Sequence, residues 1–322
     1  ITQLGVRVCM ATGDAQETAR AIGAKLGLGT RVCEAQGAHA QNPENCDLYA
    51  RVLPEDKHHI VAALQQAGHV TGMTGDGVND APALRQAELG VAVASATDVA
   101  KAAAGVVLTD PGLGGVLTVV RSGREVHRRM LTYTLNKTLK TFEIVVFLAL
   151  GLLLTGSFVI SATLIVLLLF TNDFVTMTIA TDRVQPAPKP QRWVVRRLVG
   201  AAGVFAALSL LFTFPLYWWV RATQGMSPAQ LQTVVFLLLV FTNQACIYAL
   251  RSNGRLWRFA PGRWMLLASL GDLIAVSLFA AMGWLMAPLP LAMIVGLLAA
   301  CAGFALLLDQ AKRLVFPRFA IV

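Results

Sequence analysis

Six long apolar stretches in the second half of the chain constrain its fold more than any other feature. An α-helix needs roughly 20 apolar residues to cross a bilayer. The stretches that approach this length are residues 142–159, 162–180, 199–220, 233–250, 265–287 and 291–308. Only Ile160 and Ser161 separate the first two, so we expect a tight hairpin between them. The pattern predicts an all-α domain of six transmembrane helices in a lipid bilayer.

Basic residues gather in alternate connections between these stretches. They are Arg183, Lys189, Arg192, Arg196 and Arg197, then four arginines within residues 251–263, then Lys312, Arg313 and Arg318. Cytoplasmic connections of membrane proteins are enriched in Lys and Arg. We therefore expect a multi-pass protein of the plasma membrane with both ends of this chain cytoplasmic. The net charge of +9 has the same explanation, and no nucleic-acid partner is expected because basic and aromatic residues do not interleave before residue 140.

The cysteines are scattered along the chain, at Cys9, Cys33, Cys46, Cys246 and Cys301. None forms a Cys-x-x-Cys pair, and the first three are expected on the cytoplasmic side, where disulfides are rare. We expect all of them to be buried small hydrophobic residues without a disulfide.

The part before residue 140 has charges and turns at the density of a soluble α/β domain, although the whole chain is 56% hydrophobic. Strands are expected at residues 6–11, 48–52, 70–74, 89–93 and 106–108, and helices at residues 15–26, 54–66, 81–87 and 98–103. This alternation predicts a parallel sheet covered on both faces. Ligands of such sheets bind beyond the carboxyl ends of the strands. The sequence therefore predicts a binding site at these strand ends.

The most informative motif is the turn Thr74-Gly75-Asp76-Gly77-Val78-Asn79-Asp80, which follows a predicted strand. Two carboxylates four residues apart, Asp76 and Asp80, can hold one Mg²⁺ beside a phosphate. The glycines allow the backbone to approach that phosphate closely. The alternative is a solvated acidic turn between a strand and the helix that Pro82 is placed to start.

Two further segments end or follow strands in the same way. Thr12, Gly13 and Asp14 close the first strand, where their hydroxyl and backbone N–H groups can bind phosphate oxygens; a helix N-cap by Asp14 is the alternative. Lys57 lies near the start of a helix, where its ammonium can lie over a phosphoryl group. A solvated lysine is the alternative for that position.

These motifs, in this order, resemble those of the P-type ATPases, ion pumps that phosphorylate themselves on an aspartate. The resemblance implies a haloacid-dehalogenase-like phosphorylation domain of Rossmann type, with ATP as substrate and Mg²⁺ as cofactor. It assigns phosphoryl binding and charge neutralisation to Thr12, Gly13, Asp14 and Lys57, direct Mg²⁺ coordination to Asp76, and support of the metal and phosphate shell to Asn79 and Asp80.

The family's Asp-Lys-Thr-Gly-Thr motif, which holds the nucleophilic Asp, does not occur in these 322 residues. The resemblance therefore implies a C-terminal fragment that is inactive alone, from a parent that hydrolyses ATP. Its expected parts are the end of the phosphorylation domain (1–115), a stalk helix (116–141), the six transmembrane helices (142–308) and a short cytoplasmic tail (309–322).

Ionisable residues inside apolar spans are costly and mark function. Asp173 lies beside Asn172 in the second span, Glu143 begins the first span, and Asp272 lies in the fifth. An isolated carboxyl such as Asp173 is expected to be neutral until a partner approaches, which suits proton transport. The same carboxyl with more oxygen ligands can bind Ca²⁺, Mg²⁺ or K⁺.

Residues 172–184 look like the sixth membrane helix and exit loop of the plasma-membrane proton pumps. That resemblance implies that Asp173 accepts and donates the proton. Phe174 and Val175 depart from the pattern, and Glu143 resembles a fifth-helix glutamate of calcium pumps. We therefore expect proton export, with a metal-cation pump as the alternative and a membrane-anchored phosphatase of the same soluble fold as the third reading.

Overall fold

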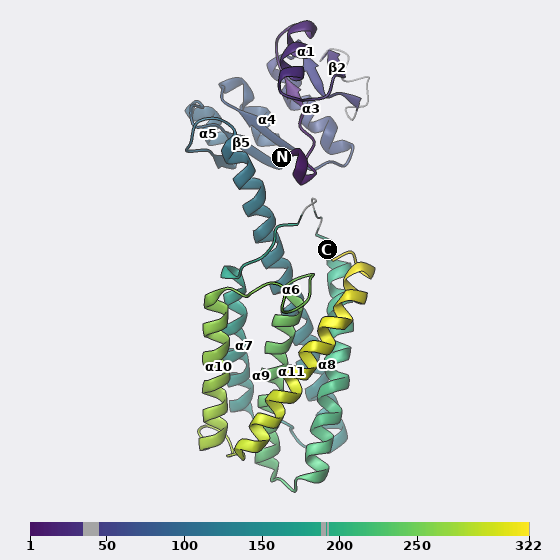
Figure 1. Cartoon of the computed structure of the whole chain (residues 1–322), viewed down its shortest axis with the longest axis vertical. Helices are drawn as coiled ribbons and strands as arrows, with labels where there is room; N and C mark the ends of the chain where they lie inside the picture. Colours follow the sequence, from purple (N-terminus) through teal and green to yellow (C-terminus); the bar gives the residue numbers. More distant parts are fainter. Residues whose placement is uncertain (35–44, 188–190, 192, 322) are drawn as a thin grey trace. The chain divides into compact units, whose positions relative to one another are not determined.

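The structure is a computed structural model that describes residues 1–34, 45–187, 191 and 193–321. Lys189 and Arg192, used above to infer orientation, lie outside the described residues. The chain divides into two compact units (Figure 1), an α/β unit that spans residues 1–123 and a helical unit that begins at residue 124. Each unit is described by itself.

The described residues of the α/β unit form two parallel sheets of three strands each, instead of the one sheet expected. In the first, β3 (Leu48–Ala50) lies between β1 (Met10–Ala11) and β2 (Val32–Glu34). In the second, β5 (Leu89–Ala92) lies between β4 (Gly72–Gly75) and β6 (Val106–Val107). The parallel α/β class is confirmed, and the strand β2 was not predicted from the sequence.

The helices of this unit follow local signals. They are α1 (Gln16–Lys25), α3 (Pro54–Gln66), α4 (Ala81–Gln86) and α5 (Asp98–Ala103), with 3₁₀ turns at Thr2–Leu4 and Val78–Asp80. At the start of α3, the Leu53 amide donates to Asp56 Oδ2 over 2.8 Å, so that the first turn is capped. Thr97 Oγ1 accepts from the Ala100 amide at the start of α5. Leu48, Leu84 and Ala92 are buried in the core.

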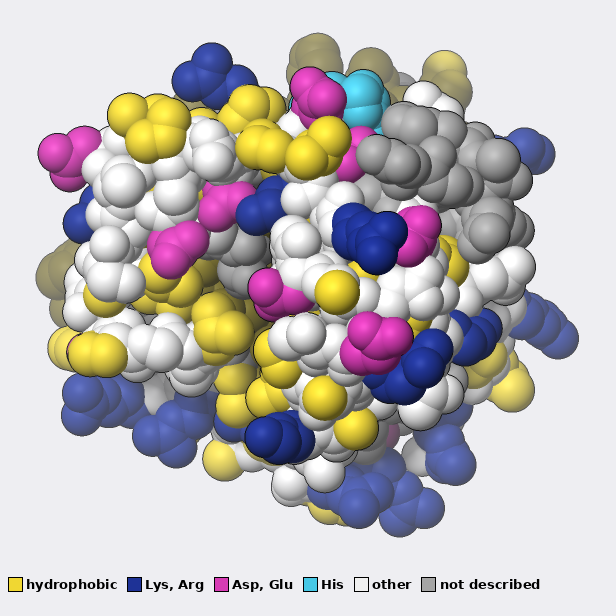
Figure 2. Space-filling model, turned by 90° about the horizontal axis from the view of Figure 1, so that it is seen from above, with side chains coloured by type: hydrophobic (Ala, Val, Ile, Leu, Met, Phe, Trp, Pro, Cys, Tyr) yellow, Lys and Arg dark blue, Asp and Glu magenta, His cyan; other side chains and the backbone are white. Residues whose placement is uncertain are grey.

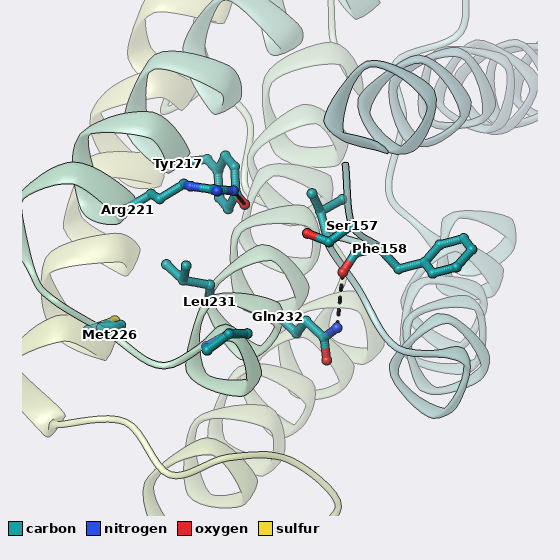
Figure 3. A pocket seen from close by; sticks show the side chains of 9 residues that line it. Ser157, Phe158, Tyr217, Arg221, Met226, Leu231 and Gln232 are labelled. Carbon is teal, nitrogen blue, oxygen red and sulfur yellow. Dashed lines mark hydrogen bonds between the residues drawn. The ribbon is translucent and has the colours of Figure 1, made fainter. Parts of the chain in front are cut away.

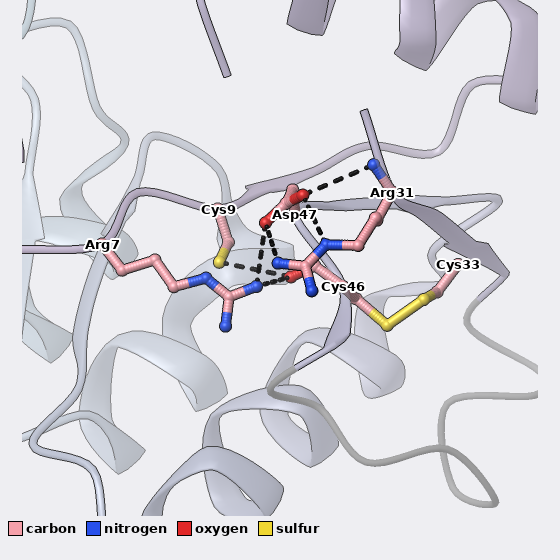
Figure 4. The surroundings of a disulfide bond; sticks show 6 residues. All are labelled: Arg7, Cys9, Arg31, Cys33, Cys46 and Asp47. Carbon is pink, nitrogen blue, oxygen red and sulfur yellow. Dashed lines mark hydrogen bonds and ion pairs between the residues drawn. A yellow bond between two sulfur atoms is a disulfide. The ribbon is translucent and has the colours of Figure 1, made fainter. Parts of the chain in front are cut away.

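Cys33 and Cys46 form a disulfide, which corrects the expectation that the chain has none (Figure 4). The parallel pairing of β2 with β3 brings these residues to a Cα–Cα distance of 5.8 Å, a contact that sequence spacing does not reveal. Beside the disulfide, hydrogen bonds from Arg31 and then Arg7 lower the pKa of Asp47 to about 2. Among the described cysteines, Cys246 and Cys301 are free and buried, as expected, whereas Cys9 is free but only half-buried.

The helical unit contains the six apolar helices that the sequence predicts. They are α6 (Gly114–Thr155, which begins in the α/β unit and enters this unit at residue 124), α7 (Ala162–Met177), α8 (Val195–Thr223), α9 (Pro228–Leu250), α10 (Arg263–Met282) and α11 (Leu291–Arg318). Each is long and apolar enough to cross a membrane, α7 when it is taken together with the 3₁₀ turn Thr178–Thr181 that continues it. Helix α9 is the central one, with 94% of its most apolar segment buried against 22% for α10 (Figure 1).

The last helix extends well beyond the predicted span. The segment expected as a tail, residues 309–322, is helical as far as Arg318. Asp309 and Lys312 are fully buried and lie 2.6 Å apart, and Lys312 Nζ donates to the carbonyl oxygen of Ala249 in α9. Because the ion pair satisfies both charges, one face of this polar end of α11 is buried in the bundle, while Arg313 and Arg318 stay exposed.

Candidate functional site

The acidic turn follows β4 and is held by the side chain of Asp80. Its Oδ2 accepts hydrogen bonds from the backbone amides of Asp76 and Gly77, at 3.1 and 3.2 Å. A Cβ added to Gly75 would lie 2.6 Å from the Cβ of Asp80, whereas one added to Gly77 meets nothing closer than 3.8 Å. The turn therefore requires glycine at position 75, where Asp80 folds back over the backbone.

Lys57 makes an ion pair with the same carboxylate. Its Nζ lies 2.6 Å from Asp80 Oδ1, and Asp80 is only 4% exposed. Burial by itself raises the pKa of Asp80, but the hydrogen bond from Lys57, those from the Gly77 and Asp76 amides and the Lys57 charge outweigh it and lower that pKa. Asp80 is therefore ionised and positions both the turn and the lysine.

The segment from Thr12 to Asp14 forms its own small network. Thr12 Oγ1 donates to Asp14 Oδ2 over 2.7 Å and accepts from the Asp14 amide. Two backbone bonds, Val52 N to Thr12 O and Arg51 N to Asp14 O, connect it to the residues before α3. Ala15 is the N-cap of α1, so Asp14 does not take the capping alternative. The segment thus lies beside the chain that carries Lys57, with Gly13 exposed.

Asp76 and Asn79 differ from Asp80 in that both are exposed. Within the described part of the chain their side chains make no hydrogen bond or ion pair, and no three His, Cys, Asp or Glu side chains gather as a metal site. Mg²⁺ is usually held by one or two carboxylates completed by waters and phosphate oxygens. The exposed Asp76 carboxylate fits that partial ligand set, whereas the oxygens of Asp80 are already engaged by Lys57 and the turn amides.

In the helical unit, both carboxylates predicted as ion ligands are paired with lysines of α6. Lys137 Nζ contacts Asp173 of α7. Lys140 Nζ lies 2.6 Å from Glu143 and also donates to Thr242 Oγ1 at 2.9 Å, and Glu143 is fully buried. Thr242 in turn donates to the other oxygen of Glu143 over 3.3 Å. The expectation of an isolated Asp173 is therefore wrong.

These lysines were not predicted as site residues, because both fall within residues 116–141, the segment expected to form the stalk helix. Lys140 and Glu143 are three residues apart, which puts them on one face of a helix. That spacing was the available signal. Asn172 is buried, and within the described residues its Oδ1 has no hydrogen-bond partner. The described helices therefore hold two separate lysine–carboxylate pairs, and Asn172, next to Asp173 in the sequence, adds an acceptor that lacks a donor.

A separate cavity of about 290 Å³ lies where the α6–α7 connection meets the α8–α9 connection. Figure 3 shows Arg221 beside Tyr217, and Gln232 donating a hydrogen bond to the carbonyl oxygen of Phe158. The cavity holds none of the candidate residues. Figure 2 shows basic and acidic side chains interspersed on the face seen from above, so no patch of one sign dominates that face.

Comparisons with known proteins match both parts of the chain. Two family models described as haloacid dehalogenase-like hydrolases match residues 1–88 and 69–120. A Methanocaldococcus jannaschii protein named as a cation-transporting ATPase is 33% identical over 337 aligned positions. That alignment covers 100% of this chain and 42% of the relative, so the chain spans less than half the length of this curated relative.

A solved structure, "Conformational changes in the catalytic domain of the CPx-ATPase CopB-B upon nucleotide binding", is 27% identical and covers 37% of this chain and 40% of that one. Its TM-score of 0.30 is too low to support a structural argument. The family matches and the helices together define a haloacid-dehalogenase-like domain followed by a helical transmembrane region.

Proposed function

We propose that this chain is the C-terminal part of a P-type ATPase whose parent protein exports protons through an aspartyl-phosphate intermediate. The observation that carries the proposal is the Lys57–Asp80 ion pair at the end of β4, in a chain that aligns over its whole length with a protein named as a cation-transporting ATPase. The nucleophilic aspartate belongs to the parent, so the chain alone is expected to be inactive.

The α/β unit supplies the groups that stabilise phosphoryl transfer. Lys57 offers a cation whose position is set by Asp80, and Thr12 offers a hydroxyl, together with Gly13 and Asp14, beside the same segment. Asp76, with Asn79 next to it in the exposed turn, is the residue that would hold Mg²⁺. Bound Mg²⁺ would neutralise charge on the phosphate oxygens. Asp80 acts by positioning Lys57 and the turn.

The lysine pairs favour a proton over a metal as the transported ion. An ammonium 2.6 Å from Glu143 occupies the space that a metal ligated by Glu143 needs. A metal must displace it and then add its own charge to a buried, low-dielectric site. A proton needs no coordination shell, because a carboxylate that parts from its lysine can take the proton itself. Asp173, the more exposed of the two carboxylates, is the proposed proton carrier.

One observation supports the metal-cation alternative. The buried Asn172 Oδ1 has no partner among the described residues, and it is an oxygen of the kind that Ca²⁺ or K⁺ selects. The Glu143 carboxylate and the Thr242 hydroxyl, which contact each other, are oxygens of the same kind. In that case Lys140 would have to leave the site when the metal binds.

The test uses the full-length parent in proteoliposomes that contain a pH-sensitive dye. We expect ATP-driven acidification without added K⁺, Na⁺ or Ca²⁺, and its loss in Asp173→Asn. The matched control is Asp110→Asn, the same substitution at an exposed residue of the α/β unit. If ATP turnover instead depends on one added metal cation and no acidification occurs, the transported ion is that metal and not a proton. An active parent whose Asp76→Asn variant keeps full Mg²⁺-dependent turnover would refute the proposed role of the acidic turn.

A further inference from the structure

Asp272 of α10 differs from every other carboxylate that the structure describes within α6 to α11 and the turns between them. Glu143, Asp173, Asp182 and Asp309 each have a Lys or Arg partner, as does Glu125. Within the described residues Asp272 has no such partner. In the described part of the chain, its side chain accepts a single hydrogen bond, of 2.9 Å, from Gln244 Nε2 of α9 to its Oδ2.

Gln244 provides a second and independent observation. Its side chain is 5% exposed, and among the described residues its Oε1 has no hydrogen-bond partner. A buried acceptor without a donor is costly. The same amide therefore satisfies Asp272 with its nitrogen but leaves its own oxygen unsatisfied.

A proton on the carboxyl of Asp272 resolves both features. A carboxylic acid and a primary amide can exchange two hydrogen bonds, one from the amide N–H and one from the acid O–H. Exchanging the positions of the Gln244 nitrogen and oxygen does not remove the need for a proton. Gln244 Oε1 would then face Asp272 Oδ2, and two acceptor oxygens at that distance also need a proton between them. An ionised Asp272 would instead be a charge in a membrane span with one amide as its support.

We propose that Asp272 is a proton-binding site, in which the protonated carboxyl and the Gln244 amide form a two-bond pair that joins α10 to α9 within the membrane. The ligand is a proton taken from water: the carboxylate gains H⁺ on the oxygen that Gln244 Nε2 does not contact, and that O–H donates to Gln244 Oε1. The site is distinct from the two lysine–carboxylate pairs considered for transport, because it uses neither α6 nor α7.

The groups on the elements packed against α10 leave this pair isolated. Helix α10 packs against α7, α9, α11 and the turn Thr178–Thr181. Their titratable or charged side chains are Asp173, Cys246, Tyr248, Cys301, Asp309, Lys312, Arg313 and Arg318. Asp173 is bound to Lys137 and Asp309 to Lys312. None of them is an ion-pair partner of Asp272 in the described structure, so the bound proton is what neutralises this carboxyl.

The test is infrared difference spectroscopy of the full-length protein in lipid, which reports the C=O stretch of a protonated carboxyl directly. We expect wild type to show at neutral pH a carboxylic-acid band that shifts in D₂O and that disappears in Asp272→Asn. The band should persist in Asp173→Asn, whether or not that variant pumps. The result is therefore independent of the proposed transport function.

A second variant guards against misfolding of the first. Gln244→Met removes the amide but keeps a side chain of similar size, so the band should remain and move to the frequency of a carboxyl that lacks the amide partner. Absence of the band in wild type, or identical spectra for wild type and Asp272→Asn, would overturn the proposal. Loss of the band on addition of Na⁺ or K⁺ at constant pH would also overturn it, in favour of a metal-cation site.

Discussion

Two lysine–carboxylate pairs, one in each unit, have the same contact distance but different surroundings. Lys57 Nζ lies 2.6 Å from Asp80 in the α/β unit, and Lys140 Nζ lies 2.6 Å from Glu143 in the helical unit. The side chains of the first pair are 24% and 6% exposed, and those of the second pair are 7% and 0% exposed. The distance alone therefore does not tell what either pair contributes.

The difference lies in what supports each carboxylate when its lysine is removed. Asp80 keeps hydrogen bonds from two backbone amides, and water can reach the place that Lys57 leaves. Among the residues that the structure describes, Glu143 keeps only the hydroxyl of Thr242, in a site without solvent access. We infer that the Lys57 pair positions a turn, whereas the Lys140 pair neutralises a buried charge.

The largest expected effect comes from breaking the pair in the helical unit. Lys140→Met leaves Glu143 buried without a counter-charge, which should lower the free energy of unfolding by about 3–5 kcal/mol. The double variant Lys140→Met/Glu143→Leu should recover most of that loss, because no buried charge remains. Denaturant unfolding of the full-length protein in detergent measures both. If the double variant is as unstable as Lys140→Met, the buried charge is not the cause.

The second prediction asks whether the turn backbone holds Asp80. Gly75→Ala places a methyl group 2.6 Å from the Cβ of Asp80, and we expect a cost of about 1–3 kcal/mol from overpacking. The matched control is Gly77→Ala, whose backbone φ of −100° and open surroundings accept a side chain. It should be neutral or stabilising, by up to about 1 kcal/mol. Equal losses in both variants of the full-length protein, measured by thermal unfolding, would contradict this account of the turn.

The elements of both units could be predicted from the sequence because their signals are local. Apolar length predicts the six helices, and strand and helix alternation with Gly and Pro at the ends predicts most of the α/β unit. The helix at 54–66 has the bounds that were expected. The short strand Val32–Glu34 escaped because three residues carry too little periodicity.

The partners within the sites were less predictable, since they depend on packing between distant segments. The contact of Glu143 with Thr242 joins residues 99 positions apart. Lys57 and Asp80 were both predicted as site residues, but their ion pair joins α3 to the acidic turn and has no sequence signature. The Cys33–Cys46 disulfide was not predicted, because the expectation rested on the rarity of disulfides in the cytoplasm. The pairing of β2 with β3, which brings the two cysteines together, is not visible in the sequence.

The third prediction removes the lysine in the α/β unit. Lys57→Met should lower the free energy of unfolding by about 1–2 kcal/mol, since Asp80 loses one charge-assisted hydrogen bond and keeps two amide donors. ATP turnover of the full-length parent should fall much more than stability does, if Lys57 acts on the phosphoryl group. If Lys140→Met also loses much more ATP turnover than stability, the two lysine pairs do not differ in function.

The smallest expected effect is in the pH dependence of the Lys57–Asp80 pair. The pKa of Asp80 is lowered in the folded protein, so the stability that its ionised form contributes is present above the unfolded-state pKa, about 3.9. That contribution is lost as the pH falls through the lower, folded-state pKa. In Lys57→Met the pKa of Asp80 is depressed less, so less stability is lost in acid. The difference in unfolding temperature between wild type and Lys57→Met should therefore shrink as the pH is lowered below about 4.

Other carboxylates with lowered pKa values, such as Asp47 and Glu88, titrate in both proteins and cancel in this difference. If the difference in unfolding temperature stays constant down to the pH at which wild type unfolds, Lys57 stabilises the turn through packing of its methylene chain and not through its charge. The Lys57 pair would then differ from the Lys140 pair in the type of interaction as well as in its surroundings.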